Sequence, residues 1–319
     1  MEFTIALIIL GLAILLIAGD LLVRGAVSLA SVLRIPALIV SLTIVAFGTS
    51  APELVVTVKA VLSGNSGIAI GNIVGSNIAN VLLVLGFPAL IYPIAVNVPG
   101  LRQHCIVMLF ATAMFAGFGY FTGSINNSAG ALLFGCIIAY VGFMWVRATT
   151  GNDDPIIDDV SEYSESKSGN WKIFLFLAAG LIGLPMGANI LVTNAASLAA
   201  DLGVRDELIG LTIIAFGTSL PELATVVAAA FHKKSDVAIG GVVGSNIFNL
   251  LAVGGATGLA GGAYFDQQST QIDLPIMIAV TLLLSVFIFL GRNIGRVSGF
   301  FFAAAYIGFI VALAMTAGA

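Results

Sequence analysis

Two glutamates inside long apolar stretches are the residues best placed to do chemistry in this sequence. Glu53 and Glu222 each end a G-T-S-x-P-E segment. An ionised carboxylate in hydrocarbon costs at least ~2.5 kcal/mol, so it must face a cavity, a partner or an ion. The nearest basic residue, Lys59, follows Glu53 by six positions and is expected to reach outward. We therefore expect both glutamates to bind a cation; the alternative is a protonated glutamate hydrogen-bonded across a helix interface.

A proline precedes each glutamate and should break the helix that carries it. Pro52 and Pro221 have no N–H to donate, and their rings clash with the preceding turn. Carbonyls freed at membrane depth must be satisfied by protein, water or ions. The oxygens expected to turn toward the glutamates are the carbonyls of Ala46 and Ala215 and the hydroxyls of Thr49, Ser50, Thr218 and Ser219. A plain kink is the alternative, but the motif occurs twice, each time beside a glutamate.

A second polar block follows each motif, G-N-I-V-G-S-N-I-A-N after the first and G-G-V-V-G-S-N-I-F-N after the second. Serine and asparagine four residues apart share one helix face. This face can present the oxygens of Ser76, Asn80, Ser245 and Asn249 to the glutamates. We expect Asn77 and Asn246 to bond neighbouring backbone instead. The glycines Gly71, Gly75, Gly240 and Gly244 are spaced for close helix packing.

The candidate ligands are all oxygen atoms, which indicates a hard cation. Ca²⁺ takes about 6–8 oxygen ligands, whereas zinc or copper prefers His or Cys. His104 and His232 are expected in water near span ends, and Cys105 and Cys136 as small apolar residues, neither a disulfide nor a metal pair. Two carboxylates match the charge of one Ca²⁺ or two Na⁺. No cofactor is expected. An enzyme is not expected either, because the sequence places no serine–histidine pair and no second aspartate beside Asp20 deep within the predicted spans.

The composition is that of an all-α integral membrane protein. Hydrophobic residues make up 59% of the 319 residues and charged residues 9%, against about 25% charged in soluble domains. Apolar runs near the ~20 residues needed to span a bilayer recur along the chain. They predict ten transmembrane helices, at about 3–23, 36–62, 67–92, 103–122, 127–147, 171–200, 206–230, 236–262, 273–291 and 296–316.

The basic residues predict how these spans are oriented. With the N-terminus outside, ten of the twelve Lys and Arg residues fall on the cytoplasmic side, and only Lys59 and Arg205 fall outside. Both termini are then extracytoplasmic. We expect the protein to lie in the cell inner (plasma) membrane. Residues 151–170 form an acidic cytoplasmic linker, which accounts for most of the net charge of −4. This charge gives no reason to expect a nucleic-acid partner; the expected surroundings are the lipid bilayer.

An internal repeat divides the chain into two halves. Residues 42–86 align without a gap on residues 211–255, with 26 of 45 positions identical and a constant offset of 169. Residues 1–150 and 171–319 would then be two five-helix units, and an odd number of spans makes the second unit inverted. Inverted repeats build midplane sites in many secondary transporters. A duplicated channel or structural protein remains the alternative.

The paired G-T-S-x-P-E and G-S-N-I-x-N blocks resemble the two alpha repeats of the cation/calcium exchanger (CaCA) superfamily, and its prokaryotic sodium/calcium exchangers in particular. The resemblance covers essentially the whole chain. It implies an antiporter that exchanges Na⁺ for Ca²⁺, with four cation sites at the membrane midplane and three Na⁺ exchanged for one Ca²⁺. We expect the exchange to occur by alternating access in a monomeric protein. The resemblance assigns ion ligation to Glu53, Glu222, Thr49, Ser50, Thr218, Ser219, Ser76, Ser245, Asn80 and Asn249, and to the carbonyls of Ala46 and Ala215.

Two details subdivide that superfamily. Its proton/calcium branch resembles G-N-A-x-E at this place, whereas this chain keeps the Thr-Ser pair that suits Na⁺ in both halves. Its potassium-dependent branch usually has Asp where this chain has Asn249, so K⁺ co-transport is not expected. Asparagine in both halves also departs from the archaeal pattern of one Asn and one Asp, which leaves the stoichiometry open. Proton/calcium exchange, K⁺-dependent exchange and a cation channel remain the alternatives.

Overall fold

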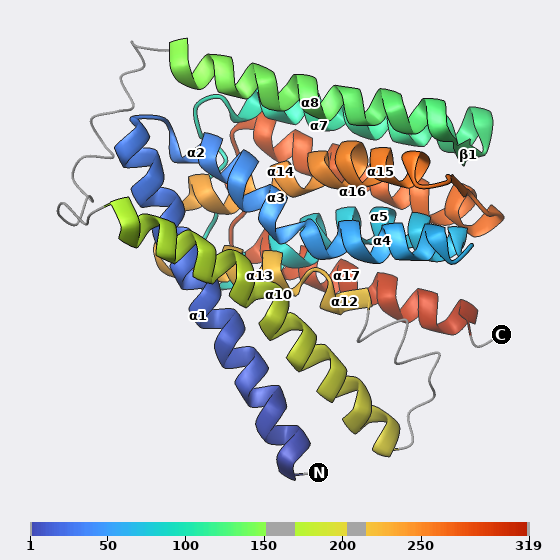
Figure 1. Ribbon diagram of the computed structural model, residues 1–319, viewed down its shortest axis with the longest axis horizontal. Helices are drawn as coiled ribbons and strands as arrows, with labels where there is room; N and C mark the ends of the chain where they lie inside the picture. Colours follow the sequence, from blue (N-terminus) through green and yellow to red (C-terminus); the bar gives the residue numbers. More distant parts are fainter. Residues whose placement is uncertain (1, 151–169, 203–214, 318–319) are drawn as a thin grey trace.

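The computed structural model describes residues 2–150, 170–202 and 215–317, and these residues are almost entirely helical (Figure 1). Eight helices in them are long and apolar enough to cross a membrane, and a bent helix pair makes a ninth span. The predicted seventh span, 206–230, lies partly outside the described residues. So does the predicted linker, apart from Asn170. The chain therefore has the architecture of a helical integral membrane protein.

The elements have the following bounds. The first half contains α1 (Glu2–Leu33), α2 (Ala37–Val40), α3 (Ala46–Thr49), α4 (Ala51–Leu62), α5 (Ser66–Ala79), α6 (Gly86–Ile91), α7 (Leu101–Gly117) and α8 (Asn127–Thr150). The second half contains α10 (Asn170–Asp201), α12 (Ala215–Gly217), α13 (Leu220–Phe231), α14 (Ser235–Phe248), α15 (Gly254–Leu259), α16 (Leu274–Leu290) and α17 (Arg296–Ala317). Short π-helical segments lie at η1 (Ser41–Val45), η2 (Asn80–Val84), η3 (Phe118–Thr122), η6 (Asn249–Val253) and η7 (Ser269–Asp273).

Several elements of the two halves match residue for residue. The bounds of α4 and α13 differ by 169 at both ends, as do those of α5 and α14 and those of η2 and η6. Even the loop backbone matches, because Gly64 and Lys233, which are also 169 apart, both have positive φ, +75° and +56°. The backbone therefore follows the repeat in the sequence.

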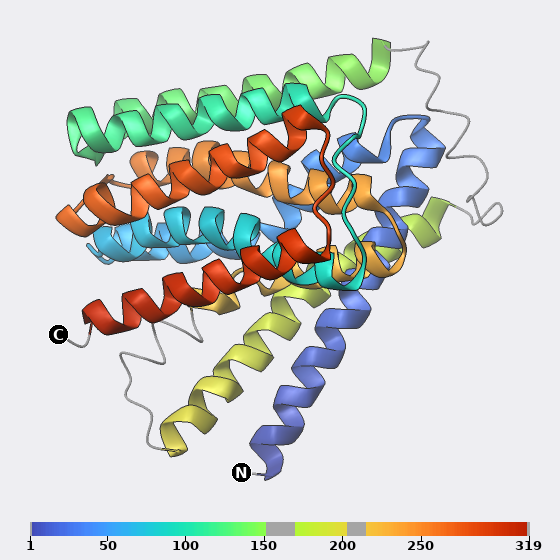
Figure 2. The same ribbon diagram turned by 180° about the vertical axis from the view of Figure 1, so that it is seen from behind.

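α5 and α14 are the central helices. Within its most apolar window, the span Ser235–Leu259 is 94% buried and the span Ser66–Ile91 72% buried, against 17% for the span that α17 forms. Polar side chains on α5 and α14 therefore face protein. α7 and α8 cover one side of this centre and α17 lies on the other (Figures 1 and 2).

α1 and α10 lie against each other and cross the remaining helices obliquely (Figures 1 and 2). Each has 32 residues, more than the ~20 needed to span a bilayer. A Cβ atom at Gly11 would lie 2.7 Å from the Leu191 nitrogen, and one at Gly187 would lie 2.9 Å from the Leu15 nitrogen. Glycine thus brings the two backbones into contact.

The packing predicted for the four glycines of the polar blocks holds in one half. Cβ atoms at Gly240 and Gly244 would lie 2.8 Å from Leu38 and 2.7 Å from Ala46. At Gly71 and Gly75, apart from the chain neighbours and the backbone of the same helix, no described atom lies within 4 Å of that position. The repeat partner of Leu38 is residue 207, which falls outside the described residues.

The helices connect at two opposite ends of the molecule. At one, here called the bridge end, Ile94 and Ile294 form a β-bridge and the Ala95 nitrogen donates to Ser235 Oγ at 3.1 Å. At the other, the strand end, β1 (Ser124–Ile125) pairs antiparallel with β2 (Ala263–Tyr264). α13 runs toward the bridge end and α4 toward the strand end (Figure 1).

Candidate ion-binding site

The two predicted helix breaks are present and carry both glutamates into the interior. Helix segments Ala37–Thr49 and Ala51–Leu62 meet at a 42° bend. Ser50 at this break has φ −84° and ψ 3°, and Ser219 has φ −85° and ψ 1°. Each proline then stands in the first turn of the following helix, where its missing N–H leaves no bond unmade. Glu53 and Glu222 follow in the same turn, and their exposed fractions are 1% and 3%.

Residues from both halves meet at Glu222. Ser50 Oγ donates to Glu222 Oε1 at 3.3 Å, and Ser245 Oγ donates to the same oxygen at 3.5 Å. Thr49 Oγ1 lies 3.3 Å from Ser245 Oγ. The motif of the first half and the polar block of the second half therefore surround one carboxylate, as a single cluster requires.

Most of the carboxylate oxygens lack a hydrogen-bond partner. Among the described residues, neither oxygen of Glu53 has a partner, and neither does Glu222 Oε2. Leaving a buried acceptor unsatisfied costs about 1–3 kcal/mol, and more for a charged group. Among the residues that the structure describes, no Lys or Arg forms an ion pair with either glutamate. Three unpaired carboxylate oxygens in a buried cluster fit the ligand set of a hard cation.

The predicted asparagine ligands of the polar blocks are buried, with amide oxygens that no described residue satisfies. Asn80 and Asn249 are both 0% exposed, and each is the first residue of a π-helical segment, η2 or η6. Asn80 Oδ1 and both amide atoms of Asn249 have no partner among the described residues. Segments of this kind are frequent at functional sites because they interrupt the regular backbone bonds.

The remaining predicted ligands are arranged less uniformly. Ser76 is buried, and Ser219 is buried with no partner for its Oγ among the described residues. Thr218 is half-buried, and Ala215 is the first residue of α12. The Ala46 carbonyl, expected to turn toward an ion, accepts hydrogen bonds from the Ser50 nitrogen at 3.0 Å and from Thr49 Oγ1 at 3.4 Å.

Two asparagines next to the cluster have contacts that the sequence did not indicate. Asn72 Nδ2 donates to the Glu53 carbonyl at 3.2 Å and to Thr57 Oγ1 at 2.8 Å, which ties α5 to α4. The prediction for Asn246 is wrong, because its Oδ1 accepts from Asn80 Nδ2 at 3.0 Å across the two halves. The prediction for Asn77 is confirmed, since its Nδ2 donates to the Ile73 carbonyl at 2.8 Å.

The histidines and cysteines lie apart from the glutamates. His104, expected in water, is 4% exposed, because α8 packs over it and Tyr140 Oη lies 3.1 Å from its Nδ1. His232 is exposed, as expected, and contacts Asp20. Cys105 and Cys136 are both free, as expected. Within the described ranges no group of three His, Cys, Asp or Glu residues could hold a transition metal.

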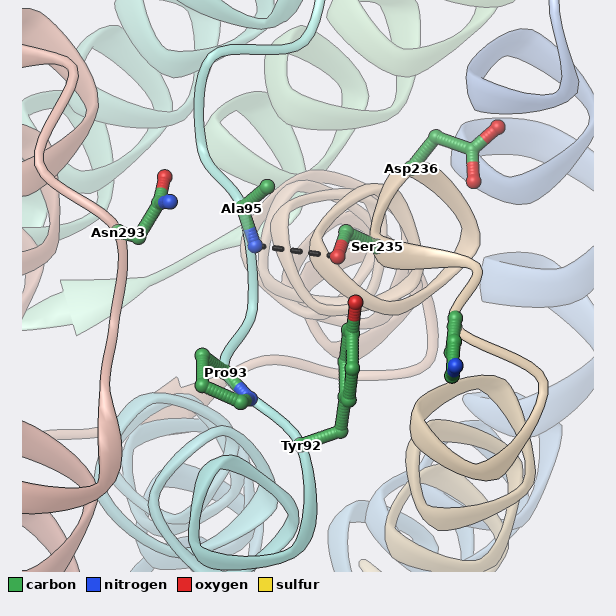
Figure 3. A pocket seen from close by; sticks show the side chains of 7 residues that line it. Tyr92, Pro93, Ala95, Ser235, Asp236 and Asn293 are labelled. Atoms are coloured by element: carbon green, nitrogen blue, oxygen red, sulfur yellow. Dashed lines mark hydrogen bonds between the residues drawn. The ribbon is translucent and has the colours of Figure 1, made fainter.

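A pocket of about 510 Å³ lies at the bridge end (Figure 3). Tyr92 and Lys233 stand on its wall, with the Lys233 ammonium 5.8 Å from the centre of the Tyr92 ring. None of the predicted ion ligands lines this pocket. The candidate site is therefore the buried polar cluster rather than this surface pocket.

Known proteins resemble this chain over nearly its full length. The protein-family model described as sodium/calcium exchanger protein matches residues 3–146 and 172–315. Inner membrane protein YrbG of Escherichia coli (strain K12) is 33% identical, over 97% of this chain and 95% of that protein. Sodium/calcium exchanger MaX1 of Methanosarcina acetivorans is 32% identical, over 96% and 97%. A solved structure of the sodium-calcium exchanger NCX_Mj, soaked with 2.5 mM Na⁺ and 0.1 mM Ca²⁺, is 30% identical and has a TM-score of 0.84, covering 98% of each chain.

Proposed function

The chain belongs to the sodium/calcium exchanger protein family, and from that premise we propose that it exchanges Na⁺ for Ca²⁺ across the membrane as a secondary active antiporter. The family is one of transporters, not of enzymes. The observation that carries the proposal is the pair of buried glutamates from matching positions of two halves, with three carboxylate oxygens that no described residue satisfies. Such a cluster offers the charge and the oxygen atoms that Ca²⁺ or Na⁺ needs.

The proposed ligands form one oxygen cage shared by both ions. The side chains are Glu53, Glu222, Thr49, Ser50, Thr218, Ser219, Ser76, Ser245, Asn80 and Asn249, joined by the carbonyls of Ala46 and Ala215. Two carboxylates cannot compensate the summed charge of Ca²⁺ and a full set of Na⁺. Loading one kind of ion therefore displaces the other, which couples the two fluxes. To bind the ion, the Ala46 carbonyl gives up the hydrogen bond that it accepts from Thr49 Oγ1.

The proposed architecture is ten transmembrane helices in two inverted five-helix repeats, residues 1–150 and 171–319, with alpha motifs at 42–86 and 211–255. The matching bounds of α4 and α13, and of α5 and α14, support the repeat. The acidic linker, 151–170, and the bridge end then face the cytoplasm, and both termini lie outside the inner membrane. The excess of Lys and Arg in the loops on that side supports this orientation.

Na⁺ is the proposed counter-ion because each break carries a Thr-Ser pair, and Ser50 is in contact with Glu222. Hydroxyl oxygens suit Na⁺, and an uncharged Asn249 removes the extra carboxylate expected of K⁺-dependent exchange. The repeat supports alternating access, since two inverted halves can exchange their environments around one midplane site.

Ca²⁺ flux into proteoliposomes, with gradients of Na⁺, K⁺ and pH imposed one at a time, tests this function. We expect an outward Na⁺ gradient alone to drive ⁴⁵Ca²⁺ uptake, with no effect of a protonophore. Ca²⁺ flux that ignores the opposing Na⁺ gradient would indicate a channel. Flux that ignores Na⁺ and collapses with the protonophore would indicate proton/calcium exchange.

A further inference from the structure

A series of contacts between three buried side chains links α7 to the ion site. Asn246 Nδ2, on α14, faces Met108 Sδ, on α7, at 3.9 Å. Asn246 Oδ1 accepts a hydrogen bond from Asn80 Nδ2 at 3.0 Å. All three side chains are 0% exposed, so water does not compete for these contacts.

The chain of contacts has one chemically consistent direction. A thioether sulfur can accept a hydrogen bond but cannot donate one, so the amide nitrogen of Asn246 must face Met108. The amide oxygen of Asn246 then faces Asn80 and can bind only its nitrogen. Asn80 is left with its Oδ1 pointing away from Asn246, and this buried oxygen has no partner among the described residues.

We propose that Asn246 is a positioning residue, which holds the Asn80 amide with its oxygen toward the transported cation. The inference rests on the proposed function, because it assumes that Asn80 is an ion ligand. An amide turned the other way would point two N–H donors at the cation, which repels it and removes one oxygen from the cage. Met108 acts one step further out, by setting the orientation of Asn246.

The repeat-related residues do not form the corresponding set of contacts. At the offset of 169 residues, Met108 corresponds to Met277, Asn246 to Asn77 and Asn80 to Asn249. Asn77 Nδ2 turns back to the Ile73 carbonyl, and neither amide atom of Asn249 has a partner among the described residues. Asn77 therefore offers a matched control, an asparagine at the same repeat position without a ligand to orient.

The test measures KM and kcat for Ca²⁺ in Na⁺-driven uptake by proteoliposomes. Partners that orient a metal ligand typically change affinity by about 10–100-fold. We expect Asn246→Ala to raise KM about tenfold or more while kcat stays within about twofold. Asn77→Ala should leave KM within about twofold of the wild type. Met108→Leu conserves volume and should raise KM in the same direction by less, which guards against misfolding of the alanine variant.

A double variant separates positioning from general packing. If Asn246 acts through Asn80, adding Asn246→Ala to Asn80→Ala should cause no further rise in KM. A KM for Asn246→Ala within twofold of the wild type, an equal rise for Asn77→Ala, or full additivity with Asn80→Ala would each overturn the inference. These outcomes leave the proposed function standing, whereas Ca²⁺ uptake without Na⁺ coupling in the unmodified protein would overturn that function.

Discussion

The helices that follow the two breaks, α4 and α13, occupy matching positions in the repeat but are packed differently. Of twelve residues in each, α13 buries ten and α4 buries three, Glu53, Thr57 and Ala60. α1 covers α13, since a Cβ atom at Gly19 would lie 2.8 Å from the Ala224 carbonyl oxygen. Val55, the repeat partner of Ala224, is 51% exposed against 6% for Ala224. Two helices of similar sequence are thus buried to different extents in one structure.

The proposed alternating access between two inverted halves would produce such a difference. In the proposed cycle the two halves exchange environments, so one state packs α13 tightly and leaves α4 uncovered. Within that proposed cycle, the structure is assigned to the state closed at the bridge end, because α1 packs against α13 there. The glutamates remain buried in both halves, at 1% and 3% exposure, so the difference concerns access to the site rather than the site itself.

The largest expected effect comes from forcing α1 away from α13. Gly19→Ala places a methyl group against the Ala224 backbone, and overpacking of this kind costs about 1–3 kcal/mol. The matched control is Gly142→Ala on α8, where a Cβ atom meets nothing within 4 Å and the helix gains about 0.5–1 kcal/mol. Thermal unfolding in one detergent compares the two variants. A Gly19→Ala protein as stable as the control would mean that α1 does not cover α13.

A smaller effect is expected from the charged contact between α1 and the end of α13. Asp20 Oδ2 pairs with Arg24 Nε at 2.9 Å, and Asp20 Oδ1 contacts His232 Nε2. The repeat partners of Asp20 and His232 are Asn189 and Ser63, which carry no charge, so the repeat-related position cannot form the same ionic contact.

Removing that charge should weaken the packing of α1 on α13 slightly. The Asp20 side chain is 34% exposed, and exposed ion pairs contribute about 0.2–1 kcal/mol. Asp20→Asn should lower the unfolding midpoint at low salt, and added salt should reduce its difference from the wild type. Asn189→Ala serves as the control. Asp20→Asn with wild-type stability at low salt would show that the contact does not hold α1.

The parts of the site that could be predicted from sequence depend on local chemistry. Pro52 and Pro221 break their helices wherever they pack, and a glutamate in an apolar helix has few permissible surroundings. Lys59 is exposed, as its position near a helix end indicates. Serine and asparagine four residues apart must share a face, which brought Asn80 and Asn249 into the candidate set.

What could not be predicted depends on contacts between distant elements. Asn246 was expected to bond local backbone, but Met108 on α7 and Asn80 of the other half give it partners that no spacing rule reveals. His104 lies near a helix end, where water is expected, yet α8 covers it. The different burial of α4 and α13 also could not be predicted from their similar sequences, because it depends on the conformation of the whole protein.

The central claim is that Glu53 and Glu222 serve one shared cage rather than two separate sites. Equilibrium ⁴⁵Ca²⁺ binding without Na⁺ tests it most directly, with Glu53→Gln and Glu222→Gln beside the wild type. The shared cage predicts one Ca²⁺ per chain in the wild type and loss of that binding in either variant, together with loss of Na⁺-driven uptake. Ca²⁺ binding that either variant retains at wild-type affinity would contradict the shared cage.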